Sequence, residues 1–204
     1  MVTLPLNVPV LSGALVRLEP LSTSHAPDLA QAAEEDRSSY RFTVVPRGAG
    51  VMDYLAAQLT RAGLTPFTQV RVRDGRAVGC TSFCAPHIFP ERPGLHAIAI
   101  GWTWLAASAQ GTGINAEAKL LLLTHAFETL EVARVELRTD TRNERSRRAI
   151  ARLGARFEGV LRSSAPSRAP GEEGMLRDSA MFSVIAAEWP AVKSALAAQV
   201  RPAR

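Results

Sequence analysis

The sequence predicts a single mixed α/β domain in which a mostly antiparallel, twisted sheet is flanked by helices. Residues 98–105 alternate large apolar side chains with small ones, which is the period of two expected of a strand. A glycine turn follows directly, and apolar side chains at helical spacing then predict one helix over residues 116–130. Residues 66–83 are two alternating segments joined by Asp74 and Gly75, a dipeptide that favours a tight hairpin turn. The hairpin and the strand after it are expected to form an antiparallel meander.

The elements before the hairpin are expected to be an arm, a strand and two helices. Residues 1–13 contain prolines and no periodic pattern, so they are predicted to be an arm laid across the surface, and residues 14–18 are predicted to be the first strand. Hydroxyl caps and an early proline predict a helix within residues 22–34. Residues 37–50 are irregular, and residues 51–62 are predicted to be the second helix. Its buried face is expected to consist of Met52, Leu55, Ala56 and Leu59.

The elements after residue 130 are expected in the order strand, helix, strand, strand and helix. They are assigned to residues 135–139, 143–153, 156–162, 176–185 and 187–204. Gly154 ends the first of these helices, and a connection rich in proline, glycine and serine over residues 163–174 is expected to be mobile. The last helix leads into a basic tail. Because no internal repeat or second series of elements is present, the chain is predicted to be one domain over residues 1–204.

The composition is that of an ordinary globular protein and excludes several classes of function. Of the 204 residues, 47% are hydrophobic and 21% are charged, and the formal net charge is +5 with a pI near 10.0. The arginines are scattered, so we expect no nucleic-acid partner. Cys80 and Cys84 lack the partners of a disulfide framework or a zinc site, so both are expected to be buried apolar residues and no metal is expected. Neither a membrane segment nor a secretory signal is found, which predicts a cytoplasmic protein, and association as a homodimer remains open.

The turn between residues 98–105 and the long helix is the candidate binding site. Gly111 and Gly113 allow the backbone to bend sharply, so that unpaired N–H groups of residues 110–115 point outward beside the positive end of the helix dipole. This arrangement favours an anion, a phosphate above all. The turn lacks the Lys-Ser or Lys-Thr of a Walker motif and the third glycine of the dinucleotide fingerprint, which disfavours both nucleotide folds.

The segment Gln110-Gly-Thr-Gly113-Ile-Asn115 resembles the Q/R-x-x-G-x-G/A signature of the GNAT superfamily of acyl-CoA N-acetyltransferases. The stretch TDTRNERSRRAIARLGARFEGVLR and residues 177–190 resemble the branch that acetylates ribosomal-protein N-termini at alanine or serine. The resemblance extends from about residue 15 to residue 189. It implies the GNAT fold, in which the central strand splays from its neighbour, and acetyl-CoA as the cosubstrate without a metal.

By this resemblance, the backbone of the glycine turn cradles the pyrophosphate of the cofactor, and the pantetheine arm extends along the central strand. The residues expected to bind the cofactor are Thr103, Trp104, Leu105, Gln110, Gly111, Thr112, Gly113, Ile114, Asn115 and Asn143. The acceptor is expected to lie near Tyr40, His87 and Trp102.

The same resemblance assigns catalytic roles to Asn143, beside the pantetheine, and to Ser146, whose hydroxyl could stabilise the leaving thiolate. Each also has an ordinary structural explanation, since Asn143 can cap a helix and Ser146 can bond back to the helix backbone. Many GNAT enzymes carry a tyrosine in this stretch, and this chain has none there. In the long helix, His125 is interpreted as a partly buried structural residue and Glu117 as favourable to the helix dipole.

The base for the acceptor amine is not evident. Many relatives carry a glutamate immediately before the Ile-Gly of the central strand, where this chain has Ala99. His87, Glu91 and His96 lie upstream and could replace it through water, although each can equally be an ordinary exposed residue.

The sequence therefore predicts direct transfer of an acetyl group from acetyl-CoA to a primary amine in a ternary complex. A protein or peptide N-terminus is the leading acceptor by resemblance. Small amines such as polyamines, amino acids and aminoglycosides are alternative acceptors, and a non-catalytic acyl-CoA-binding protein on the same scaffold is a further alternative.

Overall fold

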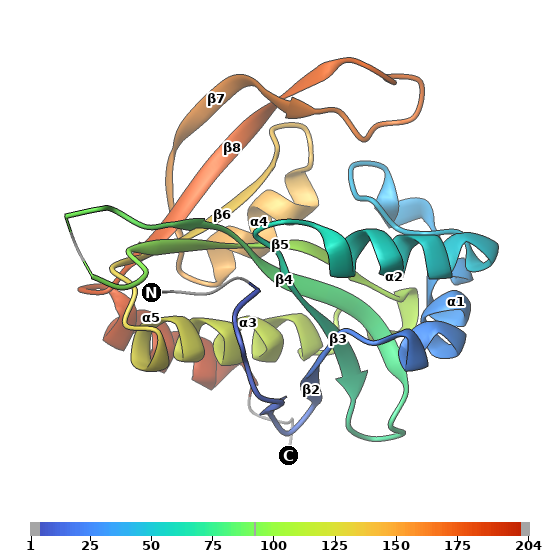
Figure 1. The fold of residues 1–204 in the computed structure, drawn as a ribbon, viewed down its shortest axis with the longest axis horizontal. Coiled ribbons are helices and arrows are strands. Elements are labelled where there is room, and N and C mark those ends of the chain that lie inside the picture. Colours follow the sequence, from blue (N-terminus) through green and yellow to red (C-terminus); the bar gives the residue numbers. More distant parts are fainter. Residues whose placement is uncertain (1–4, 92, 201–204) are drawn as a thin grey trace.

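The computed structural model describes residues 5–91 and 93–200, and in these residues the chain forms one eight-stranded sheet with helices on both faces (Figure 1). The strands lie in the order β1-β2-β3-β4-β5-β6-β8-β7. Their bounds are β1 (Leu11–Ser12), β2 (Val16–Pro20), β3 (Thr65–Arg71), β4 (Ala77–His87), β5 (Ala97–Leu105), β6 (Arg134–Asp140), β7 (Arg156–Pro166) and β8 (Leu176–Ile185). The helices are α1 (Ala26–Glu34), α2 (Val51–Thr60), α3 (Ile114–Thr124), α4 (Glu144–Arg152) and α5 (Trp189–Val200). The predicted mixed α/β class is confirmed.

The pairing of the strands is antiparallel throughout the described sheet, except that β5 and β6 run parallel. The meander of β3, β4 and β5 is therefore confirmed. The hairpin predicted around Asp74 and Gly75 is also confirmed. Its loop, residues 72–76, is longer than a two-residue turn, and in it the N–H of Gly75 donates to the carbonyl of Arg71 over 2.9 Å. The carboxylate of Asp74 accepts bonds of 3.0 and 2.9 Å from Nε of Arg71, which stabilises this longer loop.

β5 and β6 separate part of the way along their length. Their pairing begins at Ala97 with Arg134 and ends at Ile100 with Leu137, although β5 continues to Leu105. A bulge follows at once in β5, where Trp102 has a φ of 53°, a conformation that a bulky residue rarely adopts. The splayed central strand pair that the resemblance implies is therefore present, and its open part leads toward the glycine turn.

The two faces of the sheet are covered by different helices. In Figure 1, α3 and α5 lie side by side below the sheet, while α2 crosses above it and the β7–β8 hairpin rises beyond the other elements. The main core is formed by the sheet together with α1, α2, α3 and α5, and it contains the fully buried side chains of Phe67, Phe83, Ile98, Leu122 and Leu196. No helix in the described residues is long and apolar enough to cross a membrane.

The buried face of α2 differs from the expectation. Of the four residues expected there, Leu55 is buried, but Met52 is 51% exposed, Leu59 is 44% exposed and Ala56 is also exposed, whereas Tyr54 is buried in their place. The reason is a specific contact, since the hydroxyl of Tyr54 accepts a hydrogen bond of 3.2 Å from the indole of Trp104 on β5. The spacing of apolar residues identified the helix correctly, but the face that it predicts to be buried is not the face that contacts Trp104.

Several boundaries also differ from the prediction. The arm contains β1, which pairs with β2, and the N–H of Leu6 donates to Oγ1 of Thr65 over 2.9 Å. The long helix begins at Ile114, ends at Thr124 and continues as a π turn over His125–Thr129. β7 runs on to Pro166, so the first part of the connection expected to be mobile is strand. Residues 1–4 of the arm and 201–204 of the basic tail lie outside the described residues.

Glu117 joins the first turn of α3 to the beginning of β2. Its side chain is 5% exposed, and its carboxylate accepts hydrogen bonds from the backbone N–H groups of Ala14, Leu15 and Val16 over 2.9, 2.6 and 2.8 Å. A Cβ on Gly13 would lie 2.4 Å from this carboxylate, which explains the glycine. Glu117 therefore does more than favour the helix dipole, because it fixes α3 against an edge of the sheet.

We expect Glu117→Ala to lower the free energy of unfolding by roughly 3 kcal/mol, because three backbone N–H groups lose a charged acceptor. The measurement is urea unfolding followed by circular dichroism. The control is Glu144→Ala, which removes a highly exposed glutamate from the first turn of α4 and should cost at most about 1 kcal/mol. Equal losses in the two variants would contradict the anchoring role.

Candidate active site

The glycine turn presents a row of free backbone donors. Gly111 and Gly113 have φ values of 75° and 86°, in the left-handed region that glycine adopts readily. Within the described residues, no hydrogen bond uses the N–H of any residue from 111 to 116. A Cβ on Gly111 would meet open space, whereas one on Gly113 would lie 3.0 Å from Cδ1 of Leu15. The turn therefore has the free amides and the access that an anion requires.

Gln110 connects the glycine turn to α4. Its side-chain oxygen accepts a hydrogen bond of 2.5 Å from the guanidinium of Arg145, in the first turn of α4. On the β3 side of the turn, Arg73 and Thr112 help to line a cavity of about 140 Å³. Positive side chains are thus present on both sides of the row of amides.

The carbonyl of Leu105, at the end of β5, accepts two hydrogen bonds. The hydroxyl of Tyr40 donates over 2.8 Å, and Nε2 of Gln110 donates over 2.7 Å. Burial raises the pKa of Tyr40 to about 12, so this phenol stays protonated and keeps its proton for the bond. Tyr40 also packs edge-on against Trp104, with ring centroids 6.4 Å apart. The structure therefore places Tyr40 beside the glycine turn, with its hydroxyl already engaged.

The β5–β6 fork is the part of the two strands after Ile100 and Leu137, where their pairing has ended. Asn143 and Ser146 lie together at the start of α4, at the same open end of this fork as the glycine turn. Oδ1 of Asn143 accepts the N–H of Ser146 over 3.1 Å, so Asn143 is the helix cap that its sequence position also allows. Its amide NH₂ is not used by this cap. Among the described residues, no hydrogen bond to the hydroxyl of Ser146 is found, and the bond back to the helix is absent.

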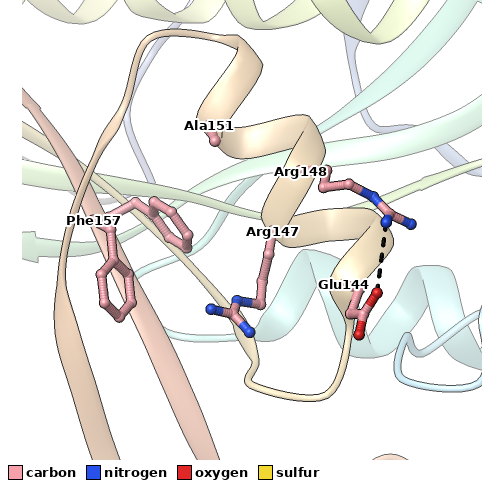
Figure 2. Close-up of a pocket in the computed structure, with 6 residues that line it drawn as sticks. Glu144, Arg147, Arg148, Ala151 and Phe157 are labelled. Carbon is pink, nitrogen blue, oxygen red and sulfur yellow. Dashed lines mark ion pairs between the residues drawn. The ribbon is translucent and has the colours of Figure 1, made fainter.

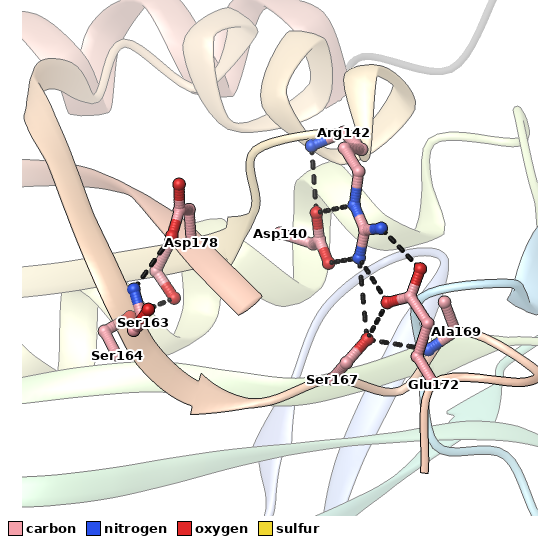
Figure 3. A network of polar contacts seen from close by, with 9 residues as sticks. Asp140, Arg142, Ser163, Ser164, Ser167, Ala169, Glu172 and Asp178 are labelled. Atoms are coloured by element: carbon pink, nitrogen blue, oxygen red, sulfur yellow. Dashed lines mark hydrogen bonds and ion pairs between the residues drawn. The ribbon is translucent and has the colours of Figure 1, made fainter. Parts of the chain in front are cut away.

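A network around Arg142 holds the segment before α4 in place (Figure 3). Its guanidinium bonds to both carboxylate oxygens of Asp140 over 2.9 and 2.8 Å and to both oxygens of Glu172 over 2.7 and 2.9 Å. It also lies 5.2 Å from the ring centroid of Phe42. Hydrogen bonds from Arg142 and Ser167 lower the pKa of Glu172 to about 2. Arg142 thereby ties β6, the β7–β8 connection and the loop after α1 together beside Asn143.

The residues expected near the acceptor are not all brought together. Trp102 lies at the bulge, 4.5 Å from the guanidinium of Arg61, on the side of the sheet that carries α2. His87 is exposed and pairs with Ala97, at the opposite end of β5 from the glycine turn. His96 lies in the same region, where its ring packs against Phe89. Trp102 is therefore beside the fork, whereas the histidines lie beyond its closed end.

Lys119 is a buried residue of the site region that the sequence analysis missed. It is 4% exposed, and its Nζ donates to the hydroxyls of Thr81 and Thr103 over 3.0 and 2.8 Å. Burial lowers the pKa of Lys119 to about 7, because no carboxylate compensates the cost of burying its charge. Its position in the buried stripe of α3, next to Ala118 and three residues before Leu122, was the available signal.

A separate cavity of about 410 Å³ lies between α4 and the β7–β8 hairpin (Figure 2). Phe157 and Phe182 form its apolar wall, and Arg147 lies 6.0 Å from the ring centroid of Phe157. None of the predicted site residues lines it. Within the described residues, no group of three or more histidine, cysteine or acidic side chains is arranged to hold a metal ion.

Comparison with known families gives a match over most of the chain. Residues 16–156 match the model of the acetyltransferase (GNAT) domain. The chain is also 34% identical over 90 residues to the "Putative ribosomal N-acetyltransferase YdaF" of Bacillus subtilis (strain 168). That match covers 44% of this chain and spans less than half, 46%, of the curated relative.

Solved structures with the same fold cover nearly the whole chain. A GCN5-related N-acetyltransferase from Brucella melitensis is 28% identical, with a TM-score of 0.82 over 95% of this chain and 86% of that chain. Mycobacterium smegmatis RimJ, solved in complex with CoA-disulfide, is 23% identical, with a TM-score of 0.72 over 93% of this chain and 90% of that chain. The latter likeness bears on the fold alone.

We expect stability to rise with pH between about 7 and 10 partly because of Lys119. In the unfolded chain a lysine titrates near pH 10.4, whereas the folded pKa is about 7, so in this window the unfolded state binds more protons and the free energy of unfolding increases with pH. Lys119→Met should reduce this slope in urea unfolding at pH 7, 8.5 and 10. Lys193→Met, at the exposed lysine of α5, should keep the wild-type slope. An unchanged slope in Lys119→Met would show that the buried amine stays charged.

Proposed function

Because the chain belongs to the GNAT acetyltransferase domain family, we propose that it transfers an acetyl group from acetyl-CoA to the N-terminal amine of a protein or peptide. The observation that carries the proposal is the glycine turn, whose row of free N–H groups lies at the open end of the β5–β6 fork. The name of the Bacillus subtilis relative supports a ribosomal-protein acceptor.

The residues present fit the cofactor. The N–H groups of residues 111–116 would hold the pyrophosphate, with Arg73 and Arg145 adding positive charge on either side. The pantetheine would lie along β5 after Ile100, where the backbone has no partner in β6. The side chains of Thr103 and Trp104 are engaged by Lys119 and Tyr54, so we assign the contact in this stretch to the backbone. When bound, acetyl-CoA supplies an activated acyl group with a thiolate as leaving group.

The burial of the two cysteines supports direct transfer over a route through an acyl-cysteine intermediate. Cys80 and Cys84 are both buried and free. Burial raises the pKa of Cys80 to about 12 and that of Cys84 to about 11, so neither is a thiolate near neutral pH. Neither is therefore suited to carry an acyl group, and attack by the acceptor amine on the thioester in a ternary complex is the simpler route.

We assign two roles to the start of α4. The amide NH₂ of Asn143 orients the pantetheine, because its oxygen is used by the helix cap while its N–H groups remain available. The hydroxyl of Ser146 donates a hydrogen bond to the departing thiolate. The bonds of Arg142 to Asp140 hold the segment from which both side chains project.

The proposal is tested by following thiol release from acetyl-CoA with defined acceptors. We expect release with free peptides that begin with alanine or serine. No release is expected with the same peptides blocked at the N-terminus but carrying an internal lysine. Spermidine, free amino acids and kanamycin form the comparison arms. Release with one of these small amines and not with peptides would contradict the proposed acceptor, and tight acetyl-CoA binding without release in any arm would favour a non-catalytic binding protein.

The cofactor site is tested separately with Gly111→Asn. Asparagine tolerates positive φ, so the backbone keeps its conformation while a side chain enters the space beside the free amides. We expect the Kd for CoA, measured by isothermal titration calorimetry, to rise at least about tenfold, a loss of roughly 1.4 kcal/mol. Gly94→Asn is the matched control, because Gly94 also has positive φ and open surroundings but lies before the closed end of β5. Equal affinity in both variants would remove the glycine turn from the cofactor site.

A further inference from the structure

The residue before Ile100 on β5 is Ala99, which carries no ionisable group. Ala99 is 2% exposed and packs with Leu64 and Cys84 on the side of the sheet that carries α2. A carboxylate that serves the acceptor amine must therefore come from another residue. The sheet register identifies one, because Ala99 pairs in parallel with Glu136 of β6.

Glu136 occupies the neighbouring position on the same face of the sheet. Paired residues of adjacent strands project to the same side, and the strands lie about 4.8 Å apart. The Ala99–Glu136 pair comes one step before the last pair, Ile100 with Leu137, so Glu136 stands directly at the closed end of the fork. His87 pairs with Ala97, two residues farther back along β5, and is exposed.

The carboxylate of Glu136 is oriented but not fully engaged. Nε of Arg134 donates to Oε1 of Glu136 over 2.9 Å, while the terminal nitrogens of Arg134 bond to Glu158 on β7 over 2.6 and 2.5 Å. Within the described residues, no hydrogen bond to Oε2 of Glu136 is found. The side chain of Glu136 is 18% exposed. One oxygen is therefore fixed and the other is available, at a partly buried position beside the fork.

The charged and titratable groups around Glu136 come from three strands. Arg134 and Arg138 flank it on β6, Glu158 of β7 shares the guanidinium of Arg134 with it, and Cys84 of β4 pairs with Ala99, the residue that pairs with Glu136. Among the influences on the pKa of Cys84, burial is the largest, and the charges of Arg138 and Glu136 act in opposite directions. Arg134 holds one carboxylate oxygen of Glu136, and the other oxygen is the one that can accept a proton.

We propose that Glu136 accepts the ammonium proton of the acceptor amine, directly or through one water, and thereby generates the neutral nucleophile at the fork. This assignment rests on the acetyl transfer proposed above. The neutral nitrogen then forms a bond to the thioester carbonyl carbon, and the C–S bond breaks. The second amine proton goes to the thiolate to give the free thiol, and the first proton leaves Glu136 for solvent. The products are the amide, the thiol and one proton, so atoms and charge balance.

The test is the pH dependence of kcat/KM in Glu136→Gln, with a free alanine-initiated peptide as the acceptor. The amide oxygen of glutamine can still accept from Arg134, so the substitution removes the charge and keeps the contact. An α-amino group titrates near pH 8, so without a base only the neutral fraction of the acceptor reacts. We expect a loss of about 30-fold at pH 6.5, where roughly 3% of such an amine is neutral. At pH 9.5, where most of the amine is neutral, the expected loss is about threefold at most.

Two further variants separate catalysis from structure. Glu158→Gln disturbs the same guanidinium without touching Glu136 and should keep the wild-type pH profile, with acetyl-CoA affinity unchanged. Glu136→Asp keeps the charge and should keep the wild-type profile at a lower rate. If a thermal melt shows that Glu136→Gln is not folded, the pH profile of Glu136→Asp is the test of the proposal.

The outcomes distinguish the two proposals. If the wild type turns over and Glu136→Gln loses no kcat/KM, or loses the same factor at pH 6.5 and pH 9.5, the role of Glu136 is overturned and the proposed function stands. The role of Glu136 is also overturned if kcat/KM of Glu136→Asp rises with pH as steeply as expected for Glu136→Gln. Absence of thiol release in the wild type with every acceptor would overturn the proposed function, and the role of Glu136 with it.

Discussion

The parallel pairing of β5 and β6 stops at Ile100 and Leu137, and the arrangement of the site depends on that stop. The bulge at Trp102 turns β5 immediately afterwards, so the two strands diverge and leave their facing backbone edges without a ladder partner. Because the strands run in the same direction, the segments that follow them lie at the same end of the fork. One is the glycine turn and the other is the start of α4, and the contact between Arg145 and Gln110 joins them.

The helix that begins at this turn is fixed from two directions. Glu117 binds three backbone N–H groups at the start of β2, and Lys119 reaches into the sheet between β4 and β5. Both residues lie within the first two turns of α3, next to the free amides. Polar groups buried on a rigid helix orient these amides before any ligand arrives, which reduces the cost of ordering on binding.

The fold and the conformation of the glycine turn could be predicted from the sequence because both depend on local patterns. Period-two alternation identified β5, and the spacing of Gly111 and Gly113 identified the turn. Long-range polar contacts left no such pattern, since the partners of Glu117 lie about 100 residues away in the chain. The register between β5 and β6 could not be predicted from the sequence either, so only the structure shows that Glu136 lies beside Ala99. The roles proposed for Asn143 and Ser146 stay predictions, because the cap geometry is compatible with a structural role as well.

The two hydrogen bonds to the carbonyl of Leu105 join two separate parts of the chain at the end of β5. One donor, Gln110, belongs to the glycine turn, and the other, Tyr40, belongs to the loop after α1. Any displacement of Leu105 would move the acceptor of both hydrogen bonds at once. If the turn and the loop each contacted a ligand, thermodynamic linkage would require each ligand to change the affinity for the other by the same factor.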